Sequence, residues 1–211
     1  MLQRETVSGK VLDLIIELQE KTYLKDLFLV GDTGLALQIG HRESVDIDLF
    51  TTENFNQEGL LEALEADFGF NLDFIENNTL KGSVEGVKVD ILSHKYGMVK
   101  PVNTIENIRL ASVQDIAAMK VNAISNDGTR VKDFIDIYFL LKGNTIADIL
   151  TYYSNKYELR NPLHALKSLN YFDDVVTDDW PVIIGEKGLT WKKVMQAIDK
   201  ACIKFTSKML D

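Results

Sequence analysis

The sequence is poor in cysteine, histidine and proline. Its single cysteine, Cys202, has no second cysteine in the chain with which to form a disulfide. The three histidines and the cysteine show no spacing typical of a zinc site. Only three prolines occur, and none of them lies in a linker-like stretch. The sequence therefore excludes a disulfide scaffold and a Cys/His zinc module.

Long hydrophobic runs and an excess of positive charge are also lacking. No apolar run approaches the roughly 20 residues of a membrane helix. Met1 leads into polar residues, so we expect no signal peptide and a cytoplasmic protein that does not enter the membrane. Lys and Arg number 23 against 32 Asp and Glu, a net charge of −9. Because nucleic-acid binding relies on basic residues, this charge argues against a general nucleic-acid binder but does not exclude a nucleic-acid substrate held by a local basic patch.

The apolar pattern divides the chain into a mixed first half and a helical second half. Helices are expected at 5–22, 33–39 and 57–66, and strands at 26–30, 44–50, 71–77, 79–85 and 87–93. Thr33 is the expected cap of the second helix, and Glu85–Gly86 the expected hairpin turn. From Ser112 onward we expect helices. The order predicts an α/β (α+β) core with a mixed sheet in residues 1–110, followed by a helical C-terminal region, residues 111–211, packed on that core.

Two aspartates lie in a stretch that otherwise reads as a buried strand, "SVDIDLF". Alternate side chains of a strand share a face, so Asp46 and Asp48 point the same way while Val45, Ile47 and Leu49 are expected in the core. Two carboxylates ~4 Å apart repel by roughly 4 kcal/mol at an effective dielectric constant near 20. Such a pair favours a bound cation, and oxygen ligands without His or Cys suit Mg²⁺.

A third acid and a glycine extend this candidate site. Asp90 interrupts the apolar run "VKVDIL" and is expected on a strand beside the pair. Three carboxylates on adjacent strands can hold two metal ions for phosphoryl or nucleotidyl transfer. Gly31 separates a strand from a helix, where backbone can approach a phosphate and the helix N-terminus favours anions. The alternative is that Asp46 and Asp48 merely form the solvent face of an edge strand.

These residues, in this order, resemble the nucleotidyltransferase superfamily with the DNA polymerase β-like fold. The fuller stretch "FLVGDTGLALQIGHRESVDIDLF" is similar to the nucleotidyltransferase toxins of the AbiEii/AbiGii type. Two later stretches, "ASVQDIAAMKVNAI" and "GTRVKDFIDIYFLL", resemble further motifs of that family, an Asp-containing helix with a lysine and then Lys-Asp-x-x-Asp. The resemblance extends from Leu27 to Leu141.

The resemblance implies a role for each matching residue. The implied metal ligands are Asp46, Asp48 and Asp90. The implied nucleotide-binding residues are Gly31, Asp32, Thr33, Lys120, Lys132 and Asp133. The implied catalytic residues are Asp46, Asp48, Asp90, Lys132 and Asp136. The implied cofactor is Mg²⁺ or Mn²⁺, with an NTP as substrate.

The implied reaction is transfer of a nucleoside monophosphate to an acceptor hydroxyl, with the 3′ end of RNA or tRNA as acceptor. The implied biological role is the toxin of a bacterial toxin–antitoxin pair, with an antitoxin protein as partner. Asp32 stands where the family usually has Gly or Ser, and its carboxylate repels a triphosphate unless a cation offsets its charge. The alternatives are a catalytically degenerate domain that binds a nucleotide or a partner, and a nucleotidyltransferase that modifies protein hydroxyls.

Simpler explanations exist for several of these residues. Lys132 and Asp136 are spaced as an i,i+4 surface pair, worth about 0.2–0.5 kcal/mol on any helix. Lys120, flanked by apolar residues, could snorkel from a half-buried helix. Asp115 is expected to be structural, because an acid near a helix N-terminus suits the helix dipole. Arg42 could bind phosphate or RNA, although an arginine in an exposed turn is usually only solvated.

Overall fold

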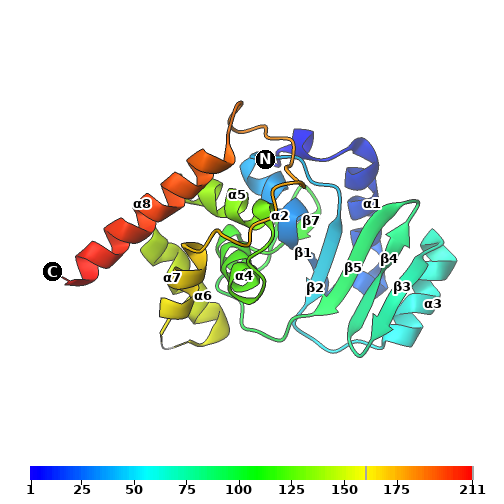
Figure 1. Ribbon diagram of the computed structural model, residues 1–211. Coiled ribbons are helices and arrows are strands. Elements are labelled where there is room, and N and C mark those ends of the chain that lie inside the picture. The colour runs from blue at the N-terminus through cyan, green and yellow to red at the C-terminus, as the bar shows by residue number, and fades with distance from the viewer. Residues whose placement is uncertain (160, 211) are drawn as a thin grey trace. The chain divides into compact units, whose positions relative to one another are not determined.

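The computed structural model describes residues 1–159 and 161–210, and it divides into two compact units. We call Met1–Gly97 with Pro101–Ser112 the sheet unit. We call Met98–Lys100 with the chain from Val113 onward the helical unit. None of the described helices combines the length and apolarity that crossing a membrane requires. Figure 1 labels the elements of both units.

The sheet unit is built on a seven-stranded mixed sheet with the order β3-β4-β5-β2-β1-β7-β6. Its helices are η1 (Arg4–Thr6), α1 (Gly9–Glu20), η2 (Thr22–Leu24), α2 (Gly31–Ile39) and α3 (Gln57–Phe68). Its strands are β1 (Phe28–Leu29), β2 (Ile47–Thr51), β3 (Asn71–Glu76), β4 (Thr79–Val84), β5 (Val87–Ser93), β6 (Asn103–Ile105) and β7 (Ile108–Leu110). The mixed α/β fold predicted from the sequence is thus confirmed.

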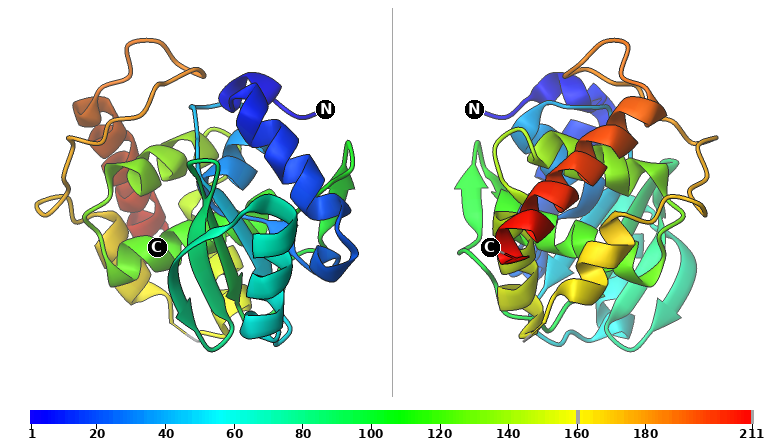
Figure 2. Two further views of the ribbon diagram at one scale, coloured as in Figure 1. Left: turned by 90° about the vertical axis from the view of Figure 1, so that its right-hand side faces the viewer. Right: turned by 60° about the vertical axis from the view of Figure 1, so that its left-hand side comes forward.

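One face of the sheet holds the core of the sheet unit. Helices α1 and α3 lie on this face (Figure 2), where the apolar stripe of α1 meets alternate residues of the strands. Ile47 and Leu49 of β2 and Val89 and Ile91 of β5 are fully buried in this cluster. Because side chains alternate along a strand, the residues between them, including Asp48 and Asp90, lie on the other face.

Several local expectations are corrected by the structure. Val45 was expected in the core, but its side chain is 63% exposed because β2 begins only at Ile47. Helix α2 begins at Gly31 with Val30 at the N-cap, so Thr33 lies inside the helix and does not cap it. The N-terminal segment is two helices rather than one, and Ser8 caps α1 by accepting a bond from the Val11 backbone N–H (3.2 Å).

The turns of the sheet unit show why its hairpins form. Glu85 and Gly86 both have positive φ, so the predicted turn between β4 and β5 is confirmed. A second hairpin, β6–β7, was not predicted from the sequence. Its turn residues Glu106 and Asn107 also have positive φ, the geometry that matches the twist of two-residue hairpins. β7 then pairs with β1 in parallel and joins this hairpin to the sheet.

In its described residues the helical unit contains five helices, α4 (Val113–Asn126), α5 (Val131–Leu140), α6 (Ile146–Tyr157), α7 (Leu163–Leu169) and α8 (Trp191–Leu210). Helix α4 packs against α5, α6 and α7, and α8 packs against α5, α6 and α7. Thr145 and Asp148 form a capping box at the start of α6, which satisfies backbone N–H groups that a helix start leaves free. The helices predicted from Ser112 onward are therefore present.

Candidate active site

The sheet register brings two of the predicted acids together. β2 and β5 are parallel neighbours, and Asp48 is the direct partner of Asp90 in their register. Paired residues of neighbouring strands face the same side of a sheet. Asp46 precedes Asp48 by two residues, just before β2 begins. We call Asp46, Asp48 and Asp90 the strand carboxylates.

Gly31 lies directly against one of these acids. Its φ of +65° is in the left-handed region, which glycine adopts without a steric penalty. A Cβ at this position would lie 2.2 Å from Asp48 Oδ2, so any larger residue would collide with the carboxylate. Gly31 is also the first residue of α2, whose N-terminus favours anionic groups. The turn therefore places a helix N-terminus next to the carboxylate of Asp48.

Thr33 fixes the backbone in front of β2. Its side chain is fully buried, and its hydroxyl donates to the backbone carbonyl of Asp46. The Thr33 Oγ1 atom also lies 2.8 Å from Ser44 Oγ. The hydroxyl is thus engaged inside the protein, where it holds the segment that carries Asp46. Contact between Thr33 and a nucleotide phosphate stays a prediction.

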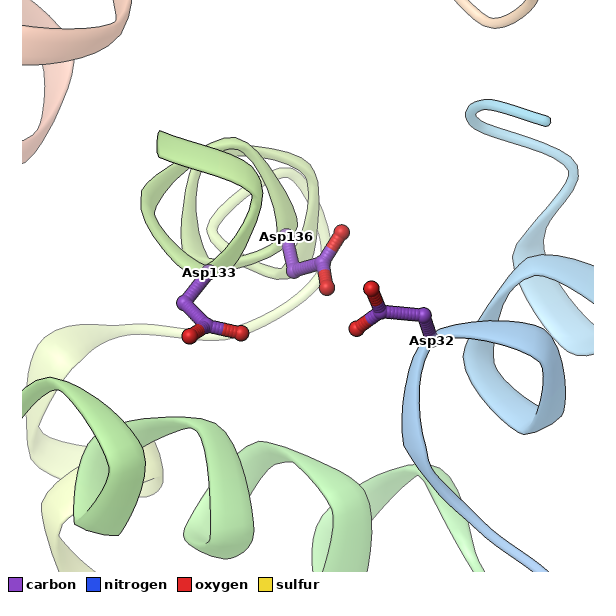
Figure 3. Close-up of side chains that lie close together, drawn as sticks. All are labelled: Asp32, Asp133 and Asp136. Atoms are coloured by element: carbon purple, nitrogen blue, oxygen red, sulfur yellow. The ribbon is translucent and has the colours of Figure 1, made fainter. Parts of the chain in front are cut away.

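Asp32 has a cationic partner within the sheet unit. It lies in the first turn of α2 (Figure 3), and its Oδ2 atom is 3.1 Å from Arg42 Nη2. The Arg42 side chain is only 1% exposed, so the expectation of a solvated arginine in an exposed turn was wrong. Because the guanidinium offsets the charge of Asp32, this carboxylate does not present a bare negative charge at the start of α2.

Two lysines flank the third acid. Asp90 Oδ2 lies 3.4 Å from Lys88 Nζ and 3.7 Å from Lys81 Nζ. Burial lowers the pKa of Lys88, but the strand carboxylates raise it, and the net shift is upward. All three acids therefore act on the same ammonium group. The other oxygen of Asp90, Oδ1, is buried and has no hydrogen-bond partner in the described part of the chain.

The donor set of the strand carboxylates fits a hard divalent cation. It consists of carboxylate oxygens alone, which suit Mg²⁺ or Mn²⁺. The unpaired Oδ1 atom of Asp90 is one such oxygen, and Asp48 stands beside it in register. Among the described residues, the oxygens of these three acids do not all come within 4.8 Å of one another. Binding one ion with all three acids would therefore require these side chains to move closer together.

The helical unit joins three residues of the later motifs. Asp133 and Asp136 project from the same side of α5 (Figure 3), and Lys120 reaches them from α4. Lys120 Nζ lies 2.7 Å from Asp133 Oδ1 and 2.7 Å from Asp136 Oδ2. All three residues are buried. Lys120 is therefore a buried ion-pair partner, and the snorkelling alternative was wrong.

Lys132 lies outside this cluster. Its ammonium pairs with Asp179 and not with Asp136, so the simpler explanation of their i,i+4 spacing as a surface pair does not hold. Asp136 instead binds Lys120. The roles of Lys120, Lys132, Asp133 and Asp136 in nucleotide binding or catalysis stay predictions.

Asp115 has the structural role expected of it. Its fully buried carboxylate accepts bonds from the backbone N–H groups of Val99 (2.9 Å) and Lys100 (3.1 Å). Lys156 Nζ, from α6, lies 3.0 Å from the same carboxylate. Asp115 thus fastens the short segment Met98–Lys100 to the helical unit.

Sequence reasoning missed three residues of this region. Arg42 was noted but not as the partner of Asp32, because the two are separated by a whole helix. Lys88 precedes Asp90 by two residues, so the alternation of a strand could have placed both on one face. Lys81 carried no such signal, since only the pairing of β4 with β5 puts it beside Asp90.

Comparison with known proteins supports a single family. A family model described as "Nucleotidyl transferase AbiEii toxin, Type IV TA system" matches residues 14–198. The uncharacterized protein aq_aa25 of Aquifex aeolicus (strain VF5) is 29% identical over 155 residues, which are 71% of this chain and 75% of that protein.

Two solved structures from Helicobacter pylori share the fold. A candidate nucleotidyltransferase has a TM-score of 0.58 at 18% identity, covering 94% of this chain and 93% of that one. JHP933 has a TM-score of 0.57 at 17% identity, covering 94% and 90%. At such identities the likeness shows the fold, which is that of the polymerase β-like nucleotidyltransferases. Because the family model matches most of the length of this chain, the chain belongs to the AbiEii family of nucleotidyltransferase toxins.

Proposed function

We propose that this protein transfers the nucleoside monophosphate of an NTP to a hydroxyl group at the 3′ end of an RNA, such as a tRNA, with Mg²⁺ or Mn²⁺ as cofactor. The observation that carries the proposal is the contact of Gly31 with Asp48, together with the pairing of Asp48 with Asp90. A helix N-terminus suited to phosphates and a pair of carboxylates suited to a divalent cation are thereby neighbours.

In this reaction the acceptor oxygen forms a bond to the α-phosphorus, and the bond from that phosphorus to the β-phosphate oxygen breaks. Pyrophosphate leaves, and the proton of the acceptor hydroxyl passes to a base. Asp46 and Asp48 would hold the metal, and Asp90 would hold a second metal or take the proton. When bound, the metal supplies positive charge to the triphosphate and to the leaving pyrophosphate.

In the sheet unit, backbone N–H groups would bind phosphate and a buried side chain would position a metal ligand. The first N–H groups of α2 would bind phosphate oxygens at Gly31. Thr33 would keep Asp46 in place through its bond to the Asp46 carbonyl. The resemblance assigns nucleotide contact to Lys120 and Lys132, and of these only Lys120 is held between two carboxylates.

The pairing of Asp32 with Arg42 weighs against a degenerate site. The concern with Asp32 is electrostatic, because a bare carboxylate repels a triphosphate. A guanidinium 3.1 Å away supplies the compensating cation from within the same unit. The pair therefore supports an active enzyme. Membership of a toxin family further leads us to propose an antitoxin as the biological partner.

The test is incorporation of label from each α-labelled NTP, with Mg²⁺, into total RNA and into cell protein. Wild type and Asp46→Asn are compared, and circular dichroism checks that the variant is folded. We expect label in the RNA fraction with wild type and none above background with Asp46→Asn. Equal labelling by the two proteins would refute the role of Asp46. Label in the protein fraction would instead identify a protein-modifying enzyme.

A further inference from the structure

A row of paired residues crosses four strands of the sheet at the level of the carboxylates. Asp48 pairs with Asp90, Asp90 with Lys81, and Lys81 with Phe74 of β3. Partners in register share a face, so all four side chains lie on the face opposite to α1 and α3. On the side of β1 the row ends at Gly31, which contacts Asp48.

The chemistry changes along this row. The N-terminus of α2 lies at the Gly31 end of the row, and the carboxylates lie in the middle. Lysine side chains and an aromatic ring lie at the β3 end. Lys81 and Lys88 are 42% and 55% exposed at their side chains although both contact Asp90. Phe74 is 47% exposed on the edge strand. These groups are therefore accessible to a ligand that approaches Asp90 from the β3 side.

Neutralising Asp90 does not explain the whole arrangement. Asp90 has two ammonium groups within 4.0 Å, and both lysine side chains stay exposed enough to contact a ligand as well. A single exposed phenylalanine is ordinary on a protein surface. Here, however, the ring is the register partner of one of those lysines, on a chain whose net charge is −9. Positive charge beside an exposed aromatic ring is the combination that binds single-stranded nucleic acid, through phosphates and base stacking.

We propose that Phe74, Lys81 and Lys88 form the subsite for the acceptor strand, which is single-stranded RNA. Phe74 stacks on a base near the 3′ end, and the two lysines contact the neighbouring phosphodiester. This inference rests on the proposed nucleotidyl transfer and assigns residues to its acceptor.

The geometry of the reaction agrees with this assignment. In an in-line displacement the attacking and leaving oxygens lie on opposite sides of the phosphorus. The row puts the triphosphate end at Gly31 and the acceptor end at Phe74, with the strand carboxylates between them. With strands about 4.8 Å apart, Phe74 lies roughly 10 Å from Asp90 across the sheet. That distance is within reach of a nucleotide at or next to the reacting end.

The test measures two affinities of the intact chain. Fluorescence anisotropy gives the affinity for a labelled single-stranded RNA, and a separate titration gives the affinity for a Mg²⁺-bound non-hydrolysable NTP. We expect Phe74→Ala to weaken RNA binding about tenfold, within the range for one stacked base, and to leave nucleotide affinity unchanged. Lys81→Gln and Lys88→Gln should each lower the slope of log affinity against log salt by about 0.7.

Two matched controls accompany these variants. Ile75 is the next residue of β3, is similarly exposed and faces the opposite side as the partner of Leu80, so Ile75→Ala should leave RNA affinity unchanged. Lys25 is an exposed lysine after η2, so Lys25→Gln controls for the loss of one positive charge.

The outcomes separate this inference from the function on which it rests. Unchanged RNA affinity in Phe74→Ala, with RNA bound by wild type, overturns the subsite. Transfer of label to protein rather than RNA also overturns the subsite, while nucleotidyl transfer stands. Failure of wild type to bind any NTP overturns the proposed function, and the RNA titration of Phe74→Ala still decides the subsite on its own.

Discussion

At the scale of single residues, Gly31 and Asp32 have different structural requirements. Gly31 needs a left-handed backbone and no side chain, because Asp48 fills the space where a Cβ would be. Asp32, the next residue, brings a charge that needs Arg42. Both requirements are met by residues around the turn that we propose to bind phosphate.

We expect Gly31→Ala to be more costly than an ordinary glycine replacement. The left-handed backbone costs an alanine about 1–2 kcal/mol, and collision with Asp48 adds to that. Gly86 is the matched control, because its φ is +82° but nothing lies within 4 Å of its Cβ position. Urea unfolding should show a larger loss of stability for Gly31→Ala than for Gly86→Ala. Equal losses would mean that Asp48 simply moves aside.

The sequence could predict which residues of this region matter but not all of their partners. Alternation in "SVDIDLF" and "VKVDILS" places Asp48 and Asp90 on the face of the sheet opposite to the apolar core residues, because successive side chains of a strand point to opposite faces. Arg42 could not be paired with Asp32 in this way, because that contact depends on how the chain returns after α2. The sequence likewise could not show that Lys132 turns away to Asp179.

At the scale of elements, the long periodic segments were predictable and the short ones were not. Helices α3 to α5 and strands β3 to β5 have enough alternation or helical spacing to be recognised from the sequence. β6 and β7 have three residues each, too few for a period to be evident. β1 covers only Phe28–Leu29, whereas a strand was expected at 26–30. The reason is related, because pairing with neighbouring strands rather than the local sequence pattern sets where so short a strand ends.

Glu186 links the beginning of α8 to α5 through three donors. Its carboxylate accepts from Lys142 Nζ (2.8 Å), from Tyr138 Oη (2.8 Å) and from Lys193. Hydrogen bonds from Lys142, Lys193 and Tyr138 lower the pKa of Glu186 to about 2. Because the folded pKa is depressed, the stabilising effect is present above the ordinary glutamate pKa and is lost as the pH falls toward 2.

Glu186→Gln should therefore destabilise the protein in a pH-dependent way. We expect the variant to unfold at lower urea concentration than wild type at pH 7, and the difference to shrink as the pH is lowered from about 4.5 toward 2. Urea titrations at several pH values measure this. A difference that stays constant across that range would show that the charge of Glu186 is not what stabilises the link.

At the scale of the whole molecule, the division into units does not follow a single cut in the sequence. Met98–Lys100 belongs to the helical unit, although the chain on both sides of it belongs to the sheet unit. Two backbone N–H groups of this segment satisfy the buried carboxylate of Asp115. A fragment that begins at Val113 therefore lacks part of its own structure.

A fragment of residues 113–211 should consequently be less stable than one of residues 98–211. An unsatisfied buried group costs about 1–3 kcal/mol, and Asp115 would lose two of its donors. Urea unfolding of the two fragments, followed by circular dichroism, tests this. Equal midpoints would show that the segment contributes nothing to the helical unit.

The position of β3 at the edge of the sheet has a consequence for solubility. All six of its residues are exposed, among them the apolar Leu72, Phe74 and Ile75. Such an edge invites strands of other copies to add to the sheet and aggregate. The register shift between Leu72 and Phe74 interrupts the regular ladder that addition would need, and copies carrying a charge of −9 repel one another. The irregularity of β3 thus opposes the addition of further strands at this apolar edge.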